Sequence, residues 1–143
     1  MTTRSSVRSQ LPARLLEWFR IHQRDLPWRR EVNPYKVWIS EIMLQQTQTK
    51  RVVHYFKRWM ARFPDLASVA RAKEDGLLKV WEGLGYYNRV RNIQRTALIL
   101  LRDHGGGFPQ SYDELLQLPG IGPYTAGAMM SVAFILPYCA VDG

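Results

Sequence analysis

Cysteine is almost missing from this chain, which has one, Cys139, among 143 residues. A single thiol excludes a disulfide framework and is typical of a reducing compartment, so the fold must depend on a buried core. No apolar run is long enough to cross a membrane. Acidic residues are few: 12 against 20 lysines and arginines, for a net charge of +8. This imbalance favours a polyanionic partner, and a basic protein without one is the alternative.

The sequence also lacks a convincing β-strand pattern and an internal repeat, and almost everything after residue 10 has helical periodicity. We therefore expect an all-α bundle, with residues 1–10 as a disordered basic tail and 11–143 as one domain. The spacing predicts an amphipathic helix at 11–22 and a long helix at 35–60. Further helices are predicted at 66–70, 75–81 and 86–102.

One segment, 118–124, reads Leu-Pro-Gly-Ile-Gly-Pro-Tyr and joins two helical patterns. Ser111 and Glu114 fit a capping box that starts the first helix, and Pro123 suits the first turn of the second. The glycines permit positive φ, and backbone N–H groups at such a turn form a site for phosphate. Residues 111–134 are thus predicted to form a helix–hairpin–helix that grips a nucleic-acid backbone, with an ordinary αα-hairpin as the alternative.

Glu41 is an acid in apolar surroundings that include Trp38 and Ile42, and an unbroken polar run, 45–51, follows it. A polar run of two helical turns indicates a cleft or a solvent-facing surface. Glu41 shares a helix face with Gln45. If that face is buried, the pKa of the carboxyl rises, as a general acid requires. The alternative is a solvent-exposed glutamate.

A second cluster, Gly-Leu-Gly-Tyr-Tyr-Asn-Arg at 83–89, combines glycines, adjacent aromatics and a cation. This grouping suits stacking on a base, and a helix start with core aromatics is the alternative. Arg89, Arg91 and Arg95 are expected to form a solvated basic face. Asp142 lies just beyond the second helix of the predicted hairpin and could meet Glu41 in space, but by itself it indicates no function.

Taken together, these segments resemble the helix–hairpin–helix DNA glycosylase superfamily, and within it the MutY-type adenine DNA glycosylases. The resemblance covers about residues 11–143 and implies that fold, of which this chain would hold the six-helix barrel part. The motifs that carry it are LPWR (26–29), PYKVWISEIMLQQTQ (34–48), WEGLGYYNRVRN (81–92), LPGIGPYTAGA (118–128) and VDG (141–143).

The resemblance implies that Glu41 is the catalytic acid, Asp142 its partner aspartate and Tyr124 a catalytic-site tyrosine. The sister family, endonuclease III, carries a catalytic lysine at the position of Tyr124, and a tyrosine cannot form its Schiff base. This favours a monofunctional glycosylase that uses water. The substrate or DNA-binding residues implied are Trp28 and Arg29 in the adenine pocket, Gln46 and Tyr86 as wedges in the duplex, and Arg24, Leu44, Gln45, Leu118, Gly120 and Gly122.

The implied partner is double-stranded DNA containing A:8-oxoG or A:G mispairs. The resemblance implies that the protein binds it as a monomer and that no membrane is involved. The full-length family holds a [4Fe–4S] cluster, which needs four thiolates. Because Cys139 is the single cysteine, the ligands are absent and we expect a chain truncated before the cluster region. The alternatives are a non-catalytic DNA-binding module and, further from the pattern, a bifunctional glycosylase/lyase. The implied location is the cytoplasm or nucleoid in a bacterium, and the nucleus or mitochondrion in a eukaryote.

Overall fold

A computed structural model describes residues 26–30 and 33–133, and every regular element among them is helical. The expected all-α fold is confirmed for this part of the chain. The expected tail at 1–10 and helix at 11–22 lie outside the described residues, as do Arg24, Cys139 and Asp142. The elements are α2 (Pro27–Arg30), α3 (Pro34–Leu44), α4 (Thr49–Arg62), α5 (Leu66–Arg71), α6 (Glu74–Trp81), α7 (Asn88–Asp103), α8 (Tyr112–Leu116), α9 (Pro123–Ala128) and the π-helical turn η1 (Met129–Ala133).

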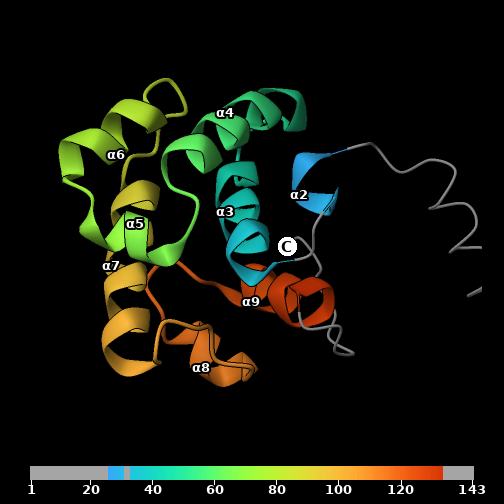
Figure 1. Cartoon of the computed structure of the whole chain (residues 1–143). Helices are drawn as coiled ribbons and strands as arrows, with labels where there is room; N and C mark the ends of the chain where they lie inside the picture. The colour runs from blue at the N-terminus through green and yellow to red at the C-terminus, as the bar shows by residue number, and fades with distance from the viewer. Residues whose placement is uncertain (1–25, 31–32, 134–143) are drawn as a thin grey trace, which may run out of the picture.

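Helix α3 lies at the centre of the fold, with α4 on one side of it and α9 on the other (Figure 1). It begins at Pro34 because Asn33 Oδ1 accepts hydrogen bonds from the backbone N–H groups of Tyr35, at 2.9 Å, and Lys36, at 3.4 Å. Proline suits this first turn since its missing N–H would have no partner there. Neighbouring helices bury most of α3, including Trp38, so it anchors the core.

The predicted continuous helix over 35–60 is wrong. Helix α3 ends at Leu44, and α4 begins only at Thr49. Between them Gln46 has a φ of 59°, in the left-handed region, which no right-handed helix continues through. The break contains neither glycine nor proline, so no local signal marked it. The polar run 45–51 belongs to this turn and to the start of α4.

A buried hydrogen-bonded aromatic cluster joins α3 to α4. Trp59 Nε1 donates to Tyr35 Oη at 2.9 Å, and Tyr35 Oη donates to the carbonyl of Phe63 at 2.6 Å. Burial raises the pKa of the Tyr35 hydroxyl, so the group stays a neutral donor. The Trp59 ring packs edge-on against Trp81 of α6, with centroids 5.8 Å apart. This cluster therefore connects three helices through groups that are all satisfied.

Helices α5, α6 and α7 form the other side of the described part (Figure 1). They agree with the predicted ranges to within two residues at each end. A reciprocal capping box starts α5, in which Asp65 Oδ1 accepts from the backbone N–H of Ser68 and the Ser68 hydroxyl accepts in return. Helix α7 packs along α5. No helix among the described residues is both long and apolar enough to cross a membrane.

Candidate functional site

An open cleft of about 470 Å³ lies where the end of α3 meets the start of α7. Both residues that the sequence marked as wedges, Gln46 and Tyr86, line it. Gln45, also a predicted contact residue, lies in the same cleft. Two loops far apart in sequence thus meet at one site. The full lining is Gln45, Gln46, Tyr86, Tyr87, Asn88, Arg89 and Arg91.

Gln46 and Tyr86 are also the two non-glycine residues of the described ranges with positive φ, at 59° and 49°. A left-handed backbone costs a residue with a Cβ about 1–2 kcal/mol, so the surrounding structure must enforce both conformations. The Tyr86 side chain is 65% exposed and that of Tyr87 is 40% exposed. The alternative of core aromatics at this helix start is therefore wrong. A strained, exposed aromatic is typical of a functional site.

Arg89 lies between the loops that carry Gln46 and Tyr86, and it is not part of a solvated face. Its side chain is half-buried, and one terminal nitrogen donates to the carbonyls of Ile42 at 2.9 Å, Met43 at 3.3 Å and Gln45. The other terminal nitrogen donates to the carbonyls of Leu84, at 3.5 Å, and the residue that follows it, at 3.4 Å. Burial lowers the pKa of Arg89. The sequence did not predict these contacts, because the acceptors are backbone carbonyls, which no sequence motif identifies.

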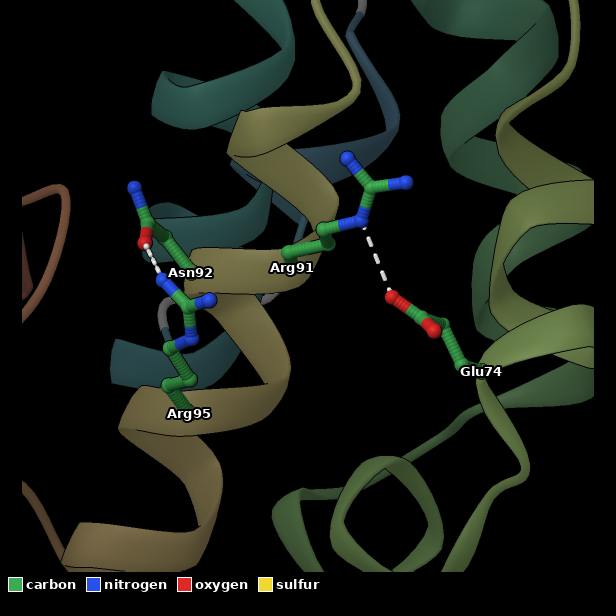
Figure 2. A network of polar contacts seen from close by, with 4 residues as sticks. All are labelled: Glu74, Arg91, Asn92 and Arg95. Carbon is green, nitrogen blue, oxygen red and sulfur yellow. Dashed lines mark hydrogen bonds and ion pairs between the residues drawn. The ribbon is translucent and has the colours of Figure 1, made fainter.

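Arg91 and Arg95, the other members of the expected basic face along α7, are exposed as predicted, and each has a polar partner (Figure 2). Arg91 Nε donates to a Glu74 carboxylate oxygen at 2.9 Å, and Arg95 donates to Asn92 Oδ1 at 3.3 Å. In the figure Arg91 extends toward Glu74 and Arg95 toward Asn92. The exposed Arg91–Glu74 pair contributes at most about 1 kcal/mol. Of the three arginines expected on this face, Arg91 and Arg95 are therefore solvated, and Arg89 alone is turned inward.

The hairpin joins α8 to α9, and α7 holds its loop. Ser111 Oγ accepts from the backbone N–H of Glu114 at 3.4 Å, which is one half of the predicted capping box, and Pro123 opens α9. Thr96 of α7 donates its hydroxyl to the carbonyl of Pro119 at 2.9 Å. The loop is therefore fixed against a neighbouring helix rather than supported by its own turn alone.

The two glycines of the hairpin differ in conformation, which corrects the expectation that both supply positive φ. Gly120 has a φ of 76°, and a Cβ there would lie 3.0 Å from Cβ of Asn92. Gly122 has a φ of −91° and a ψ of −178°, which any residue adopts, and a Cβ there would meet nothing within 4 Å. Gly120 is thus needed by the fold, whereas Gly122 leaves open space in front of α9.

Glu41 lies half-buried on α3, one turn before Gln45 and on the same face. That face is directed toward α9, because Gln45 Nε2 donates to Thr125 Oγ1 at 3.3 Å. Tyr124, the neighbour of Thr125, is 37% exposed. The fold therefore brings the helix of Glu41 against the helix of Tyr124, whereas Asp142 lies outside the described residues.

The remaining predicted contact residues are less accessible. Trp28 packs in the core, edge-on to Phe56 with centroids 5.3 Å apart, and Leu118 is buried in the same core. Leu44 is half-buried at the end of α3. The side chain of Arg29 lies outside the described set. In the free protein, the side chains of Trp28 and Leu118 thus belong to the hydrophobic core.

The implied [4Fe–4S] cluster can be tested against the donors of this chain. Such a cluster needs four thiolates, and the chain has one cysteine. Within residues 26–30 and 33–133, no group of three or more His, Cys, Asp or Glu side chains is arranged to hold a metal ion. The residues present do not fit the cluster.

Comparison with known proteins agrees with this architecture. A profile described as "HhH-GPD superfamily base excision DNA repair protein" matches residues 39–142. The chain is 48% identical over 130 residues to the adenine DNA glycosylase of Buchnera aphidicola subsp. Baizongia pistaciae, and 43% identical over 138 residues to that of Homo sapiens. Each match covers 90% of this chain, but the chain spans only 37% of the first relative and 25% of the second.

Solved structures of DNA glycosylases share this fold. A thermostable thymine-DNA glycosylase superposes with a TM-score of 0.86 at 26% identity, and a trapped endonuclease III–DNA covalent intermediate with 0.79 at 29% identity. Each match covers 99% of this chain and 65% of the other.

Proposed function

The chain belongs to the HhH-GPD superfamily of base excision DNA repair proteins, and we propose that it is part of an adenine DNA glycosylase. In this proposal the enzyme removes adenine mispaired with 8-oxoguanine by hydrolysing its N-glycosidic bond. The relatives named adenine DNA glycosylase support the reaction. The observation that carries the proposal is the pair Gln46 and Tyr86, held in left-handed conformations at the rim of one cleft.

The first step is extrusion of the adenine, because its glycosidic bond cannot be reached inside the stacked duplex. The hairpin around Gly120 and Gly122 holds the phosphate backbone without reading sequence. Gln46 and Tyr86 enter the duplex and fill the space that the adenine leaves. A mispaired base is easier to extrude by a few kcal/mol, which favours mismatched adenine over paired adenine.

The second step is departure of the base. The neutral Glu41 carboxyl donates its proton to adenine N7, which makes the base a better leaving group. The C1′–N9 bond breaks, and its electron pair leaves with adenine. The sugar then carries an oxocarbenium-like charge, which ionised Asp142 stabilises. Water adds its hydroxyl to C1′ and releases a proton. Tyr124 supplies no amine, so no Schiff base forms and the strand is not cut.

Single-turnover excision from a duplex with one A:8-oxoG pair tests this proposal in the full-length protein that carries the chain. Glu41→Gln should lower the rate at least about a hundredfold, because the amide keeps the shape but holds no acidic proton. Duplex affinity should change little. Glu82→Gln, at an exposed position of the 82–87 loop, is the matched control and should keep the rate.

Two outcomes would contradict the proposal in different ways. Duplex binding without release of adenine by the parent protein would favour the non-catalytic DNA-binding module. A covalent adduct trapped by borohydride would favour the bifunctional glycosylase/lyase, because only an imine is reduced to a stable amine.

A further inference from the structure

Arg89 contacts the two loops of the cleft at corresponding positions. The carbonyl of Gln45 belongs to the peptide bond that leads into Gln46, and Arg89 donates to it. The carbonyl of Gly85 belongs to the peptide bond that leads into Tyr86, and Arg89 donates to it at 3.4 Å. One guanidinium therefore fixes the peptide plane that precedes each left-handed residue.

The chemistry of these contacts requires arginine. A guanidinium carries its donors in a rigid planar fork, so two nitrogens can serve two different loops at once, which a lysine ammonium cannot do with the same geometry. Its charge also suits the end of α3, where the last carbonyls, among them those of Ile42 and Met43, carry the negative end of the helix dipole.

Two aromatic rings complete the connection. The guanidinium carbon lies 5.3 Å from the centroid of the Trp81 ring and 5.5 Å from that of Tyr86. Trp81 is fully buried, and its Nε1 donates to the carbonyl of Gly85 at 3.0 Å. The exposed ring of Tyr86 is thus tied through Arg89 to a ring that belongs to the core.

We propose that Arg89 is a positioning residue that sets Gln46 and Tyr86 together, before DNA binds, in the conformation that enters the duplex. The inference rests on the proposed function, since it assigns these two residues to base extrusion. Arg89 itself touches neither the adenine nor the sugar. Its contribution is preorganisation: the two loops do not have to be ordered when the duplex binds.

The two loops are not equally dependent on Arg89. The Tyr86 loop has further anchors on α4, where Arg51 donates to the carbonyl of Gly83 and Tyr55 Oη donates to that of Glu82 at 2.8 Å. These anchors hold the start of the loop, three and four residues before Tyr86. Arg89 donates to both loops, at the carbonyls that directly precede Gln46 and Tyr86.

The test compares Arg89→Met with Gln94→Met in the full-length protein. Gln94 lies on the same helix and also donates to backbone carbonyls, at 2.7 Å to Ala72 at the end of α5, which does not line the cleft. Its variant loses a comparable tertiary contact without touching the cleft. Arg89→Lys, which keeps the charge and loses the fork, is the second variant in case the methionine variant does not fold.

The first readout is amide hydrogen exchange of the free protein. In Arg89→Met, exchange should quicken at least about tenfold in both 45–47 and 85–88, since local opening follows the loss of native contacts. In Gln94→Met these segments should stay protected. Quickening in one loop alone, or equal quickening in both variants, would overturn the inference.

The second readout is the fluorescence of 2-aminopurine placed opposite 8-oxoguanine, which rises when the base is extruded. The rise should be about tenfold smaller in Arg89→Met, with an intermediate value for Arg89→Lys, because base extrusion carries a cost of a few kcal/mol that the wedges offset. Affinity for an undamaged duplex should stay within about twofold, since backbone contacts supply non-specific binding. An undiminished rise in Arg89→Met would overturn the inference.

The proposed function and the inference fail in different ways. If the parent protein extrudes no 2-aminopurine, the proposed function is wrong, and amide exchange alone decides whether Arg89 couples the two loops. If the parent extrudes the base and Arg89→Met does so equally well, the function stands and the positioning role is wrong.

Discussion

Gly120 of the hairpin and Asn92 of α7 are in such close contact that a Cβ on the glycine would lie 3.0 Å from Cβ of the asparagine. Thr96, one helical turn further on, donates to the carbonyl of Pro119. The hairpin loop is therefore a tertiary structure as much as a local turn, because α7 determines where its backbone lies.

Gly120→Ala and Gly122→Ala should consequently differ in their effects on the free energy of unfolding. Gly120→Ala forces a side chain into positive φ and against Asn92, so it should lower the free energy of unfolding by about 1–3 kcal/mol. Gly122→Ala should leave that free energy unchanged or raise it slightly, while its methyl group obstructs a phosphate and weakens matched and mismatched duplexes alike. Thermal unfolding and duplex titrations check both. Unaltered duplex binding by Gly122→Ala would contradict the phosphate site.

Tyr86→Ala should separate function from stability. Its side chain is 65% exposed, so its removal should change the free energy of unfolding by less than about 1 kcal/mol. Excision from the A:8-oxoG duplex should fall by about tenfold or more, because aromatic stacking on a base contributes about 1–3 kcal/mol. Chemical denaturation and single-turnover kinetics measure the two effects. A large loss of stability would show that the ring is structural.

Tyr35→Phe should lower stability and leave excision unchanged. The variant removes the hydroxyl that accepts from Trp59 and donates to the carbonyl of Phe63. Two buried polar groups lose a partner, so the free energy of unfolding should fall by about 1–3 kcal/mol. Excision at a temperature well below the transition should be unchanged. Denaturation curves and excision rates measured on the same preparation decide between a structural and a functional role.

The acid dependence of stability should include a contribution from Asp65. The Ser68 backbone N–H and hydroxyl hold the pKa of Asp65 below its ordinary value. The ionised carboxylate therefore favours the folded state above the ordinary pKa of about 3.9, and this contribution is lost as the pH falls through the lowered value. Asp65→Asn keeps an acceptor for the Ser68 N–H but does not titrate.

Melting temperatures measured between pH 2 and 6, a range of about two units on either side of that pKa, test this contribution. The parent protein should lose stability more steeply toward low pH than Asp65→Asn, by a small margin because the group is exposed. Asp75→Asn, at an exposed position of α6, is the matched control. Parallel curves for the parent and Asp65→Asn would contradict the contribution.

The features that the sequence determined by itself are those that depend on interactions between residues close together in the chain. Apolar periodicity and capping residues such as Ser111 depend on neighbours within a few positions, so the helices from α5 to α7 and the start of the hairpin were predictable. The motifs around Gln46 and Tyr86 likewise identified residues that line the cleft. The chemical roles of Glu41, Asp142 and Tyr124 stay predictions.

Tertiary contacts determined where α3 ends and how the two loops of the cleft are arranged. The end of α3 contains no helix breaker, and its carbonyls accept hydrogen bonds from Arg89, 47 positions beyond Ile42 in the chain. The same side chain, expected on a solvated face, lies instead between two loops. Hydrogen bonds to backbone carbonyls leave no residue pattern at the acceptor, because every residue carries the same group. For that reason only the folded structure revealed how Gln46 and Tyr86 are held in place.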